Sequence, residues 1–371
     1  MVEKLSILRN VKQLMDIYGI KGEIIVCLRN DSGHINDTYY VVIVTPQGLR
    51  RDYTFQRVNS NVFTNPMQIM HNVAAVSDHL TKKYGPFSKE KSEVMSYLTN
   101  LEGKNYTVLD DGGFWRIAEF VIGVAYDQID DPQILRDTGY MFGHFQNMLS
   151  DLDTSKLEYT IPDFHNTKKR IDALAKKAAE DPLGRCDRVK KELDFFFGHR
   201  DIADKLVDKQ LSGEQPLRVT HNDTKYNNML VDALSKRPIC VIDLDTIMPG
   251  LSAHDYGDAI RCAANKSTED EVDLSKVGLD TTYFEKFTEG FVTEAKNFLT
   301  PAEADSLALG ALTITYELAS RFLLDYIDGD NYFKIARRNH NLERARCQIR
   351  LAEDMLARYD YMCNTVARYY Q

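Results

Sequence analysis

The fold of this chain is decided by the stretch HNDTKYNN, residues 221–228, and by the apolar run VIDLD, residues 241–245. The first stretch carries Asp223 and Asn228 within one short loop. The second has the apolar residues of a buried strand and reaches Asp243 at its end. Either stretch alone is a common pattern, because aspartate and asparagine also occur as ordinary turn residues. Both stretches in this order, with strand signals around them, indicate a catalytic site.

The residue types in these two stretches suit phosphoryl transfer. That reaction needs a carboxylate to orient and deprotonate the attacking hydroxyl, oxygen ligands for a metal ion, and a cation for the developing charge. Hard oxygen donors suit Mg²⁺. We therefore predict an ATP- and magnesium-dependent kinase. Its predicted catalytic residues are Asp223 and Lys225, and its predicted metal ligands are Asn228, Asp243 and Asp245.

The first stretch matches the protein-kinase catalytic-loop pattern H-R-D-L-K-x-x-N at four positions, but the chain departs from protein kinases nearby. Asn222 replaces the arginine that senses activation-loop phosphorylation, and residues 243–245 lack the glycine of D-F-G. Only Thr246–Ala253 separates the strand from Asp255, which leaves no room for a peptide-docking platform. These departures predict a small acceptor. We expect Asp255 or Asp258 to anchor the catalytic loop, and His221 to brace it by hydrogen bonding.

Apolar periodicity predicts an α+β chain with a protein-kinase-like two-lobed fold. Residues 1–122 are expected to form a small nucleotide-binding lobe with an antiparallel sheet, and residues 123–371 a large, mostly helical catalytic and substrate lobe. The small lobe should contain a helix at 5–18, strands near 24–28, 39–43 and 53–57, a helix at Pro66–Tyr84, and strands at 105–110 and 114–121. The large lobe should contain helices at 132–150, 165–180, 184–200, 284–298, 302–326 and 341–369.

The small lobe offers candidates for holding the nucleotide. A loop at residues 31–39 lies where a phosphate-covering loop is expected, although it has one glycine rather than G-x-G-x-x-G. Arg57 is the candidate cation for the α- and β-phosphates; its alternative is a surface arginine, since residues 66–80 contain no glutamate to pair with it. Backbone groups near residues 119–121 should meet adenine. The predicted nucleotide-binding residues are Gly33, His34, Asn36, Arg57, Glu119 and Val121.

Bulk composition excludes several classes of protein. The net charge of −9 argues against general nucleic-acid binding. The six cysteines include no C-x-x-C pair, so reduced thiols in a cytoplasm are expected. We find no secretory signal pattern, and no run of about 20 apolar residues that a membrane-spanning helix needs. We therefore expect a cytoplasmic enzyme without membrane, nucleic-acid or obligate protein partners.

Five segments of this chain also resemble a known superfamily. They are residues 33–38, 55–59, 219–225, 241–250 and 321–326. They are similar to the aminoglycoside phosphotransferase and choline kinase superfamily, and within it to the N-acetylhexosamine 1-kinases; His71 departs from that pattern, where an acidic residue is expected. The resemblance implies transfer of the γ-phosphoryl group of ATP to the anomeric hydroxyl of N-acetylglucosamine or N-acetylgalactosamine, in amino-sugar salvage.

For the acceptor sugar, the predicted contact residues are Asn222, Asp223, His34, Tyr316 and Arg321. Apart from Asp223, each has an alternative as a packing residue. Two other functions remain open. One is a kinase of another small hydroxylated metabolite, such as an amino alcohol or an aminoglycoside, which the acidic balance mildly favours. The other is a nucleotide-binding pseudokinase scaffold, which the presence of Asp223, Asn228 and Asp243 disfavours.

Overall fold

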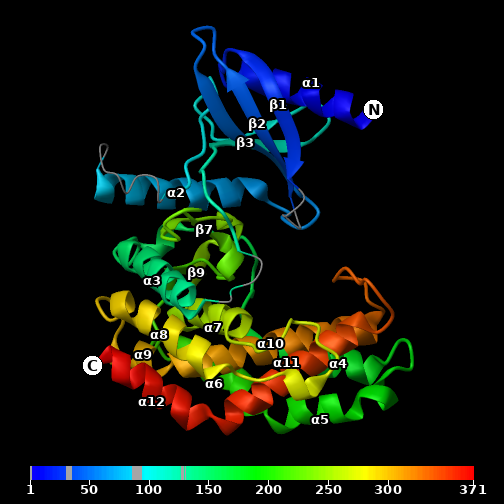
Figure 1. The fold of residues 1–371 in the computed structure, drawn as a ribbon. Helices are drawn as coiled ribbons and strands as arrows, with labels where there is room; N and C mark the ends of the chain where they lie inside the picture. Colours follow the sequence, from blue (N-terminus) through cyan, green and yellow to red (C-terminus); the bar gives the residue numbers. More distant parts are fainter. Residues whose placement is uncertain (1, 31–35, 86–93, 127–128, 130) are drawn as a thin grey trace. The chain divides into compact units, whose positions relative to one another are not determined.

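The computed structural model describes residues 2–30, 36–85, 94–126, 129 and 131–371, and its chain divides into two units (Figure 1). Unit 1 consists of Met1–Val124, Ser155–Ile161 and Ile239–Ile247. Unit 2 consists of Ala125–Thr154, Pro162–Pro238 and Met248–Gln371.

Unit 1 is built on a five-stranded antiparallel sheet with the strand order β1-β2-β3-β5-β4. Its elements are α1 (Val2–Ile17), β1 (Glu23–Asn30), β2 (Asp37–Val44), β3 (Arg50–Val58), α2 (Pro66–Tyr84), β4 (Thr107–Val108) and β5 (Phe114–Glu119). The predicted order of three strands, a helix and two strands is confirmed. The period-2 spacing of β2 and β3 succeeds as a guide because Val41, Ile43 and Phe55 belong to one core cluster, against which Tyr39 and Tyr53 pack.

The core of unit 1 lies between α1 and the sheet (Figure 1). Val11 and Leu14 of α1 pack in one cluster with Phe55 of β3 and with Trp115 and Ile117 of β5. All five side chains are buried. The amphipathic face that the sequence predicts for the first helix is therefore the face that covers the sheet.

Two late segments of the chain join unit 1 through Asn72 of α2. Its side-chain amide donates to Glu158 O (2.7 Å) and to Ile247 O (2.8 Å), and its Oδ1 accepts from the Glu158 backbone N–H (2.8 Å). Asn72 is fully buried, so these bonds satisfy a polar side chain that has no access to water. The second of these segments carries the end of β8 (Pro238–Val241) and the 3₁₀ turn η5 (Leu244–Thr246).

Unit 2 is mostly helical. Its helices are α3 (Pro132–Met148), α4 (Thr167–Glu180), α5 (Lys190–Gly198), α6 (Arg200–Leu211), α7 (Ser252–Ala263), α8 (Thr281–Ala295), α9 (Pro301–Asp305), α10 (Leu307–Asp328), α11 (His340–Ala357) and α12 (Tyr359–Tyr370). Its short strands include β6 (Arg218–Thr220), β7 (Met229–Val231) and β9 (Met248–Gly250), and η4 (Tyr226–Asn228) is a 3₁₀ turn.

The helices differ from the prediction at three places. The expected helix at 302–326 is divided at Ser306, after a short helix that the capping box of Thr300 and Glu303 starts. The expected helix at 341–369 is interrupted at Arg358. The prediction lacks helices α6 and α7. In α7 the apolar period is hidden, because several polar residues of this helix are buried as well.

Helix α10 is the central helix of unit 2, and most of its residues are buried. By length and composition alone it could cross a membrane, but 83% of its most apolar 18-residue window is buried inside the protein. It approaches α7 closely where Gly257 faces Gly310: a Cβ at either position would overlap backbone atoms of the other helix. This close approach fixes the position of α7, which carries Asp255 and Asp258.

Candidate active site

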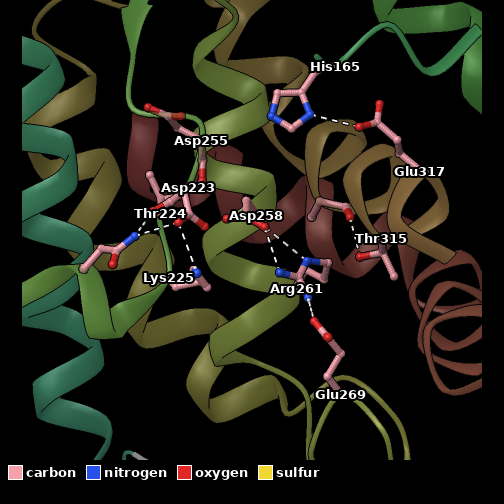
Figure 2. A network of polar contacts seen from close by, with 12 residues as sticks. His165, Asp223, Thr224, Lys225, Asp255, Asp258, Arg261, Glu269, Thr315 and Glu317 are labelled. Carbon is pink, nitrogen blue, oxygen red and sulfur yellow. Dashed lines mark hydrogen bonds and ion pairs between the residues drawn. The ribbon is translucent and has the colours of Figure 1, made fainter. Parts of the chain in front are cut away.

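The predicted catalytic loop of unit 2 begins directly after β6, which pairs antiparallel with β9. The side chain of Asp255 holds the start of this loop. Its two carboxylate oxygens accept the backbone N–H groups of His221 (2.8 Å) and Asn222 (2.7 Å), and Oδ2 also accepts from Gln146 Nε2 (2.6 Å). The expected anchoring role of Asp255 is confirmed. Figure 2 shows Asp255 above the loop residues Asp223, Thr224 and Lys225.

This anchor is a buried carboxylate, and its surroundings act on its charge in opposite directions. Burial raises the pKa of Asp255, while the N–H groups of His221, Asn222 and Gln146 favour the ionised form and oppose that rise. Asn222 has φ = 63°, in the left-handed region that asparagine tolerates better than most residues. The anchored N–H of Asn222 therefore belongs to a sharp turn that aims the next residue, Asp223.

His221 braces the loop, as the sequence predicts. The backbone N–H of Asp223 donates to His221 Nδ1 (3.2 Å), so this nitrogen acts as an acceptor and carries no proton in that arrangement. The imidazole is fully buried and meets the rings of Phe142 and Phe145 edge-on. These contacts fit a structural histidine, and the proton-transfer role of Asp223 stays a prediction.

Asp223, Lys225 and Asn228 converge within unit 2, and Figure 2 shows the side chains of Asp223 and Lys225 pointing toward each other. Asp223 Oδ2 lies 3.1 Å from Lys225 Nζ and accepts from Asn228 Nδ2 at 2.9 Å. Asn228 Nδ2 also donates to Asp223 O (2.7 Å), which turns the amide Oδ1 away from Asp223. The Asp223 side chain keeps 28% of its surface exposed, so its carboxylate can be reached by a ligand.

Asp258 stands near this cluster in Figure 2 but serves a different partner. Its Oδ1 accepts from Arg261 Nη2 (2.9 Å) and Nε (3.1 Å), and Arg261 Nη1 donates to Glu269 Oε2 (2.8 Å). The anchoring of the loop therefore comes from Asp255, while Asp258 compensates the buried charge of Arg261.

The predicted acceptor residues of unit 2 fall in different environments. Tyr316 is fully buried and its hydroxyl donates to Phe196 O (2.6 Å), which is the environment of a core residue. Arg321 is partly exposed, and its guanidinium lies over three aromatic rings at 5.5–5.9 Å from their centroids. These rings belong to Phe164, Tyr332 and Phe333. Within the described part of the chain, no carboxylate forms an ion pair with Arg321.

One turn before Arg321 on α10, Glu317 forms a buried polar cluster. Its carboxylate accepts from His165 Nδ1 (3.0 Å) and from Thr167 Oγ1 (2.7 Å), as part of Figure 2 shows. Burial alone would raise the pKa of Glu317, but the charges and hydrogen bonds of His165, together with Arg321 and Thr167, lower it to about 2. Glu317 is therefore ionised at neutral pH and adds a fixed negative charge to the Arg321 face of α10.

In unit 1 the predicted metal-binding segment turns sharply at Asp243, which has φ = 59° and ψ = 60°. Aspartate and asparagine adopt this left-handed conformation more readily than most residues, and Asp181 and Asp330 of this chain also have a positive φ. Two residues later, Asp245 is almost completely buried. It forms an ion pair with Arg116 of β5 (Nη2–Oδ1, 2.6 Å) and accepts from Asn36 Nδ2 (2.7 Å).

The predicted nucleotide-binding residues lie at several places in unit 1. Gly33 and His34 lie outside the described residues. Arg57, on β3, is 41% exposed and lies 3.6 Å from a carboxylate oxygen of Asp111, itself on the surface. Glu119 ends β5 and lines a shallow hollow of about 750 Å³, whereas Val121 follows it and is half-buried. The nucleotide roles of these residues stay predictions.

Comparisons with known proteins show the family of this chain and its fold. Residues 26–284, well over half of the chain, match the family model APH, described as the phosphotransferase enzyme family. The chain belongs to the APH phosphotransferase family. Among solved structures, it is similar to the amicoumacin kinase hAmiN, with 12% identity and a TM-score of 0.58 over 94% of this chain and 96% of that chain.

Two further solved structures share the fold of this APH phosphotransferase. A microcompartment-associated aminopropanol kinase has 12% identity and a TM-score of 0.57, with 96% of this chain and 98% of that chain covered. The Plasmodium vivax ethanolamine kinase has 13% identity and a TM-score of 0.54, covering 86% of this chain and 80% of that chain. The predicted kinase-like fold, with an antiparallel sheet in the small lobe and a helical large lobe, is confirmed.

The donor set of this APH phosphotransferase fits a hard cation such as Mg²⁺. Mg²⁺ is usually held by one or two carboxylates together with water and phosphate oxygens, so it does not require a dedicated cage of side chains. Among the described residues there is no group of three or more His, Cys, Asp or Glu side chains that could hold a metal ion. The metal-binding roles of Asn228 in unit 2 and of Asp243 in unit 1 stay predictions.

The motif spacing does not point to Arg116, which is the most deeply buried cation of unit 1. A signal was nevertheless present: Arg116 stands inside the apolar run Phe114–Val121, and an arginine in a buried strand requires a compensating carboxylate. That carboxylate, Asp245, lies 129 positions away in the sequence (245 minus 116), so no local pattern could identify it. Breaking this pair would cost about 3–5 kcal/mol of stability.

Proposed function

We propose that this APH phosphotransferase is a small-molecule kinase that phosphorylates the anomeric hydroxyl of an N-acetylhexosamine, using ATP and magnesium. The observation that carries the catalytic part is the cluster of Asp223, Lys225 and Asn228 on a loop that Asp255 anchors. The sugar as acceptor rests on the resemblance of residues 33–38, 55–59, 219–225, 241–250 and 321–326 to the N-acetylhexosamine 1-kinases.

In the proposed reaction, the anomeric oxygen attacks the γ-phosphorus and the bond from that phosphorus to the β–γ bridging oxygen breaks. The hydroxyl proton passes to the Asp223 carboxylate, which is accessible and which Asn228 holds in place. Lys225, 3.1 Å from Asp223, offsets negative charge on the transferring phosphoryl group. ADP leaves, and the product is the sugar 1-phosphate.

The guanidinium of Arg321 favours an acceptor that offers oxygen atoms to hydrogen-bond donors. Arg321 has no carboxylate ion-pair partner in the described part of the chain. Burial and the positive charge of Arg321 lower the pKa of Arg170, and the negative charge of Glu317 opposes that effect. An acceptor with hydroxyl and acetamido oxygens offers acceptors for the five N–H donors of an arginine. These donors support the sugar as acceptor, and the charge of Glu317 keeps an amino alcohol or aminoglycoside kinase as the alternative.

The experiment that tests the proposed function is phosphorus NMR of the reaction products with ATP and Mg²⁺. The acceptor panel contains N-acetylglucosamine, N-acetylgalactosamine, glucose, choline, ethanolamine and an aminoglycoside. We expect a sugar 1-phosphate resonance, coupled to the anomeric proton, from the N-acetylhexosamines alone. Phosphorylation of only the amine-bearing acceptors would overturn the assignment of a sugar as the acceptor. If no acceptor is phosphorylated and ATP is not consumed, the assignment as a sugar kinase is overturned.

A variant of Arg321 tests the predicted acceptor contact. We expect Arg321→Met to raise KM for the N-acetylhexosamine about 10- to 100-fold, because a hydrogen bond from a charged donor contributes about 1.5–3 kcal/mol. KM for ATP should stay unchanged. The matched control is Arg368→Met, which removes an arginine that stacks on a ring of α12 at the surface. Steady-state kinetics with equal effects on both KM values, or none, would refute the contact.

A further inference from the structure

Unit 1 contains a buried ion pair between Arg116 and Asp245. The side chains of Arg116 and Asp245 are 1% and 2% exposed, and Nη2 lies 2.6 Å from Oδ1. Removing two charges from water costs several kcal/mol per ion, and hydrophobic residues of similar size often give equal stability. Stability alone therefore does not explain the presence of this pair.

The second oxygen of Asp245 is also occupied. Oδ2 accepts from Asn36 Nδ2 at 2.7 Å, and Asn36 Oδ1 in turn accepts from the backbone N–H of Asn59 at 3.0 Å. Asn36 directly follows residues 31–35, which belong to the predicted phosphate-covering loop, and Asn59 directly follows β3. With both oxygens in use and the side chain buried, Asp245 is poorly suited to bind a metal ion itself.

Arg116 is fixed on its other side as well. Its Nε and Nη2 donate to Gln56 Oε1 (2.8 and 2.5 Å), and Gln56 Nε2 donates to Thr38 Oγ1 (2.9 Å). The ring of Tyr97 lies 4.8 Å from the guanidinium carbon. A planar guanidinium held at this many points leaves its partner carboxylate a single favourable position.

That position determines the turn at Asp243, because only one residue separates it from Asp245. Asp243 occupies a left-handed conformation, and such a conformation persists when the surrounding contacts determine it. We propose that Arg116, acting through Asp245, is the positioning residue that holds the Asp243 carboxylate in its metal-binding orientation and couples it to Asn36 and Asn59. This inference rests on the proposed function, in which Asp243 binds the nucleotide-associated Mg²⁺.

The test measures ATP binding by isothermal titration calorimetry at stepped Mg²⁺ concentrations, without any acceptor. The central variant is the double substitution Arg116→Met with Asp245→Asn, which leaves no unpaired buried charge and is therefore expected to fold. We expect the Mg²⁺ concentration that gives half-maximal ATP affinity to rise about tenfold or more, by analogy with the 10- to 100-fold effects of residues that orient metal ligands. The control is Lys104→Met, which removes the exposed Lys104–Glu102 pair of unit 1.

A second variant separates positioning from stability. Arg116→Lys keeps the charge but cannot reproduce the planar fork that contacts Gln56 and Asp245 together. We expect the Mg²⁺ concentration that Arg116→Lys needs for half-maximal ATP affinity to lie between those of the wild type and the double variant. This expectation does not depend on its thermal unfolding temperature. If Arg116→Lys, together with a folded double variant, shows the wild-type Mg²⁺ dependence, the positioning role is overturned. If the double variant does not fold, Arg116→Lys alone decides the question in the same way.

The failure of the proposed function has a different signature. Wild-type protein that binds no ATP, or binds it equally well with Mg²⁺ and with EDTA, overturns the metal role of Asp243 and the positioning role with it. If the wild-type protein binds ATP in a Mg²⁺-dependent way and the variants show the same dependence, the positioning role is overturned and the proposed kinase function stands.

Discussion

Replacement of Asp223 by asparagine will lower turnover about 10²- to 10⁴-fold, which is the usual contribution of a positioned general base. Asparagine keeps the size of the side chain and can still accept a hydrogen bond from Asn228 Nδ2, so the loop should keep its shape. The backbone anchors of the loop do not involve the Asp223 side chain, because Asp255 binds the N–H groups of His221 and Asn222. ATP binding should therefore survive. The measurement is kcat from ADP release, with ATP affinity from calorimetry.

The control for Asp223→Asn is Asp208→Asn, which removes an exposed carboxylate of α6 that pairs with Lys168. We expect this control to leave kcat within twofold of the wild-type value, because exposed ion pairs contribute about 0–1 kcal/mol and lie outside the loop. Full activity of Asp223→Asn would refute the assignment of the base. A loss of ATP binding that parallels the loss of kcat would instead place Asp223 in nucleotide binding.

Replacement of Asp243 by asparagine will raise the Mg²⁺ concentration needed for half-maximal activity by at least about tenfold, equivalent to 1.4 kcal/mol of binding free energy, or abolish activity. Removing a charged oxygen ligand weakens the attraction for a divalent cation. Asparagine is the informative replacement because it tolerates the left-handed backbone at φ = 59°, whereas alanine would add strain of about 1–2 kcal/mol. Saturation curves in Mg²⁺ at fixed ATP provide the measurement.

The matched control for Asp243→Asn is Asp16→Asn on the exposed face of α1, which changes the net charge equally. Any Mg²⁺ effect that the control shares would be a general effect of charge. Thermal unfolding in the presence of EDTA gives a readout that does not depend on activity: Asp243→Asn should unfold near the wild-type temperature. An unchanged Mg²⁺ requirement in Asp243→Asn would mean that the metal ligand lies elsewhere.

The sequence predicts the catalytic loop well because its interactions are local. Asp223, Lys225 and Asn228 lie within six residues, so the chain itself brings them together once the loop forms. The antiparallel sheet can likewise be predicted, because core residues such as Val41 and Ile43 recur at every second position of its strands. The helices of unit 2 are predicted less accurately: α7 is buried on nearly all sides, and polar residues such as Asp255 and Asp258 obscure its period.

Interactions between distant segments could not be predicted in the same way. The buried partner of Arg116 lies 129 positions later in the chain (245 minus 116). For Arg57, the cation that the sequence favours, the sequence left a surface arginine as the alternative, and only the structure shows that it is 41% exposed. The same holds for Asn72, whose amide joins residues 155–161 and 239–247 to unit 1. Only the packing of the folded chain selects among the many polar groups that could satisfy a buried donor.

By itself, the sequence determined the fold class, the order of strands and helices in unit 1, and the set of groups on the 221–228 loop, because spacing along the chain fixes all three. The tertiary structure decided which carboxylate anchors that loop and which cation holds Asp245, because both are choices between groups that are far apart in sequence. A buried charge must find its partner wherever the fold places one, and that place is set by the packing of whole elements rather than by neighbouring residues.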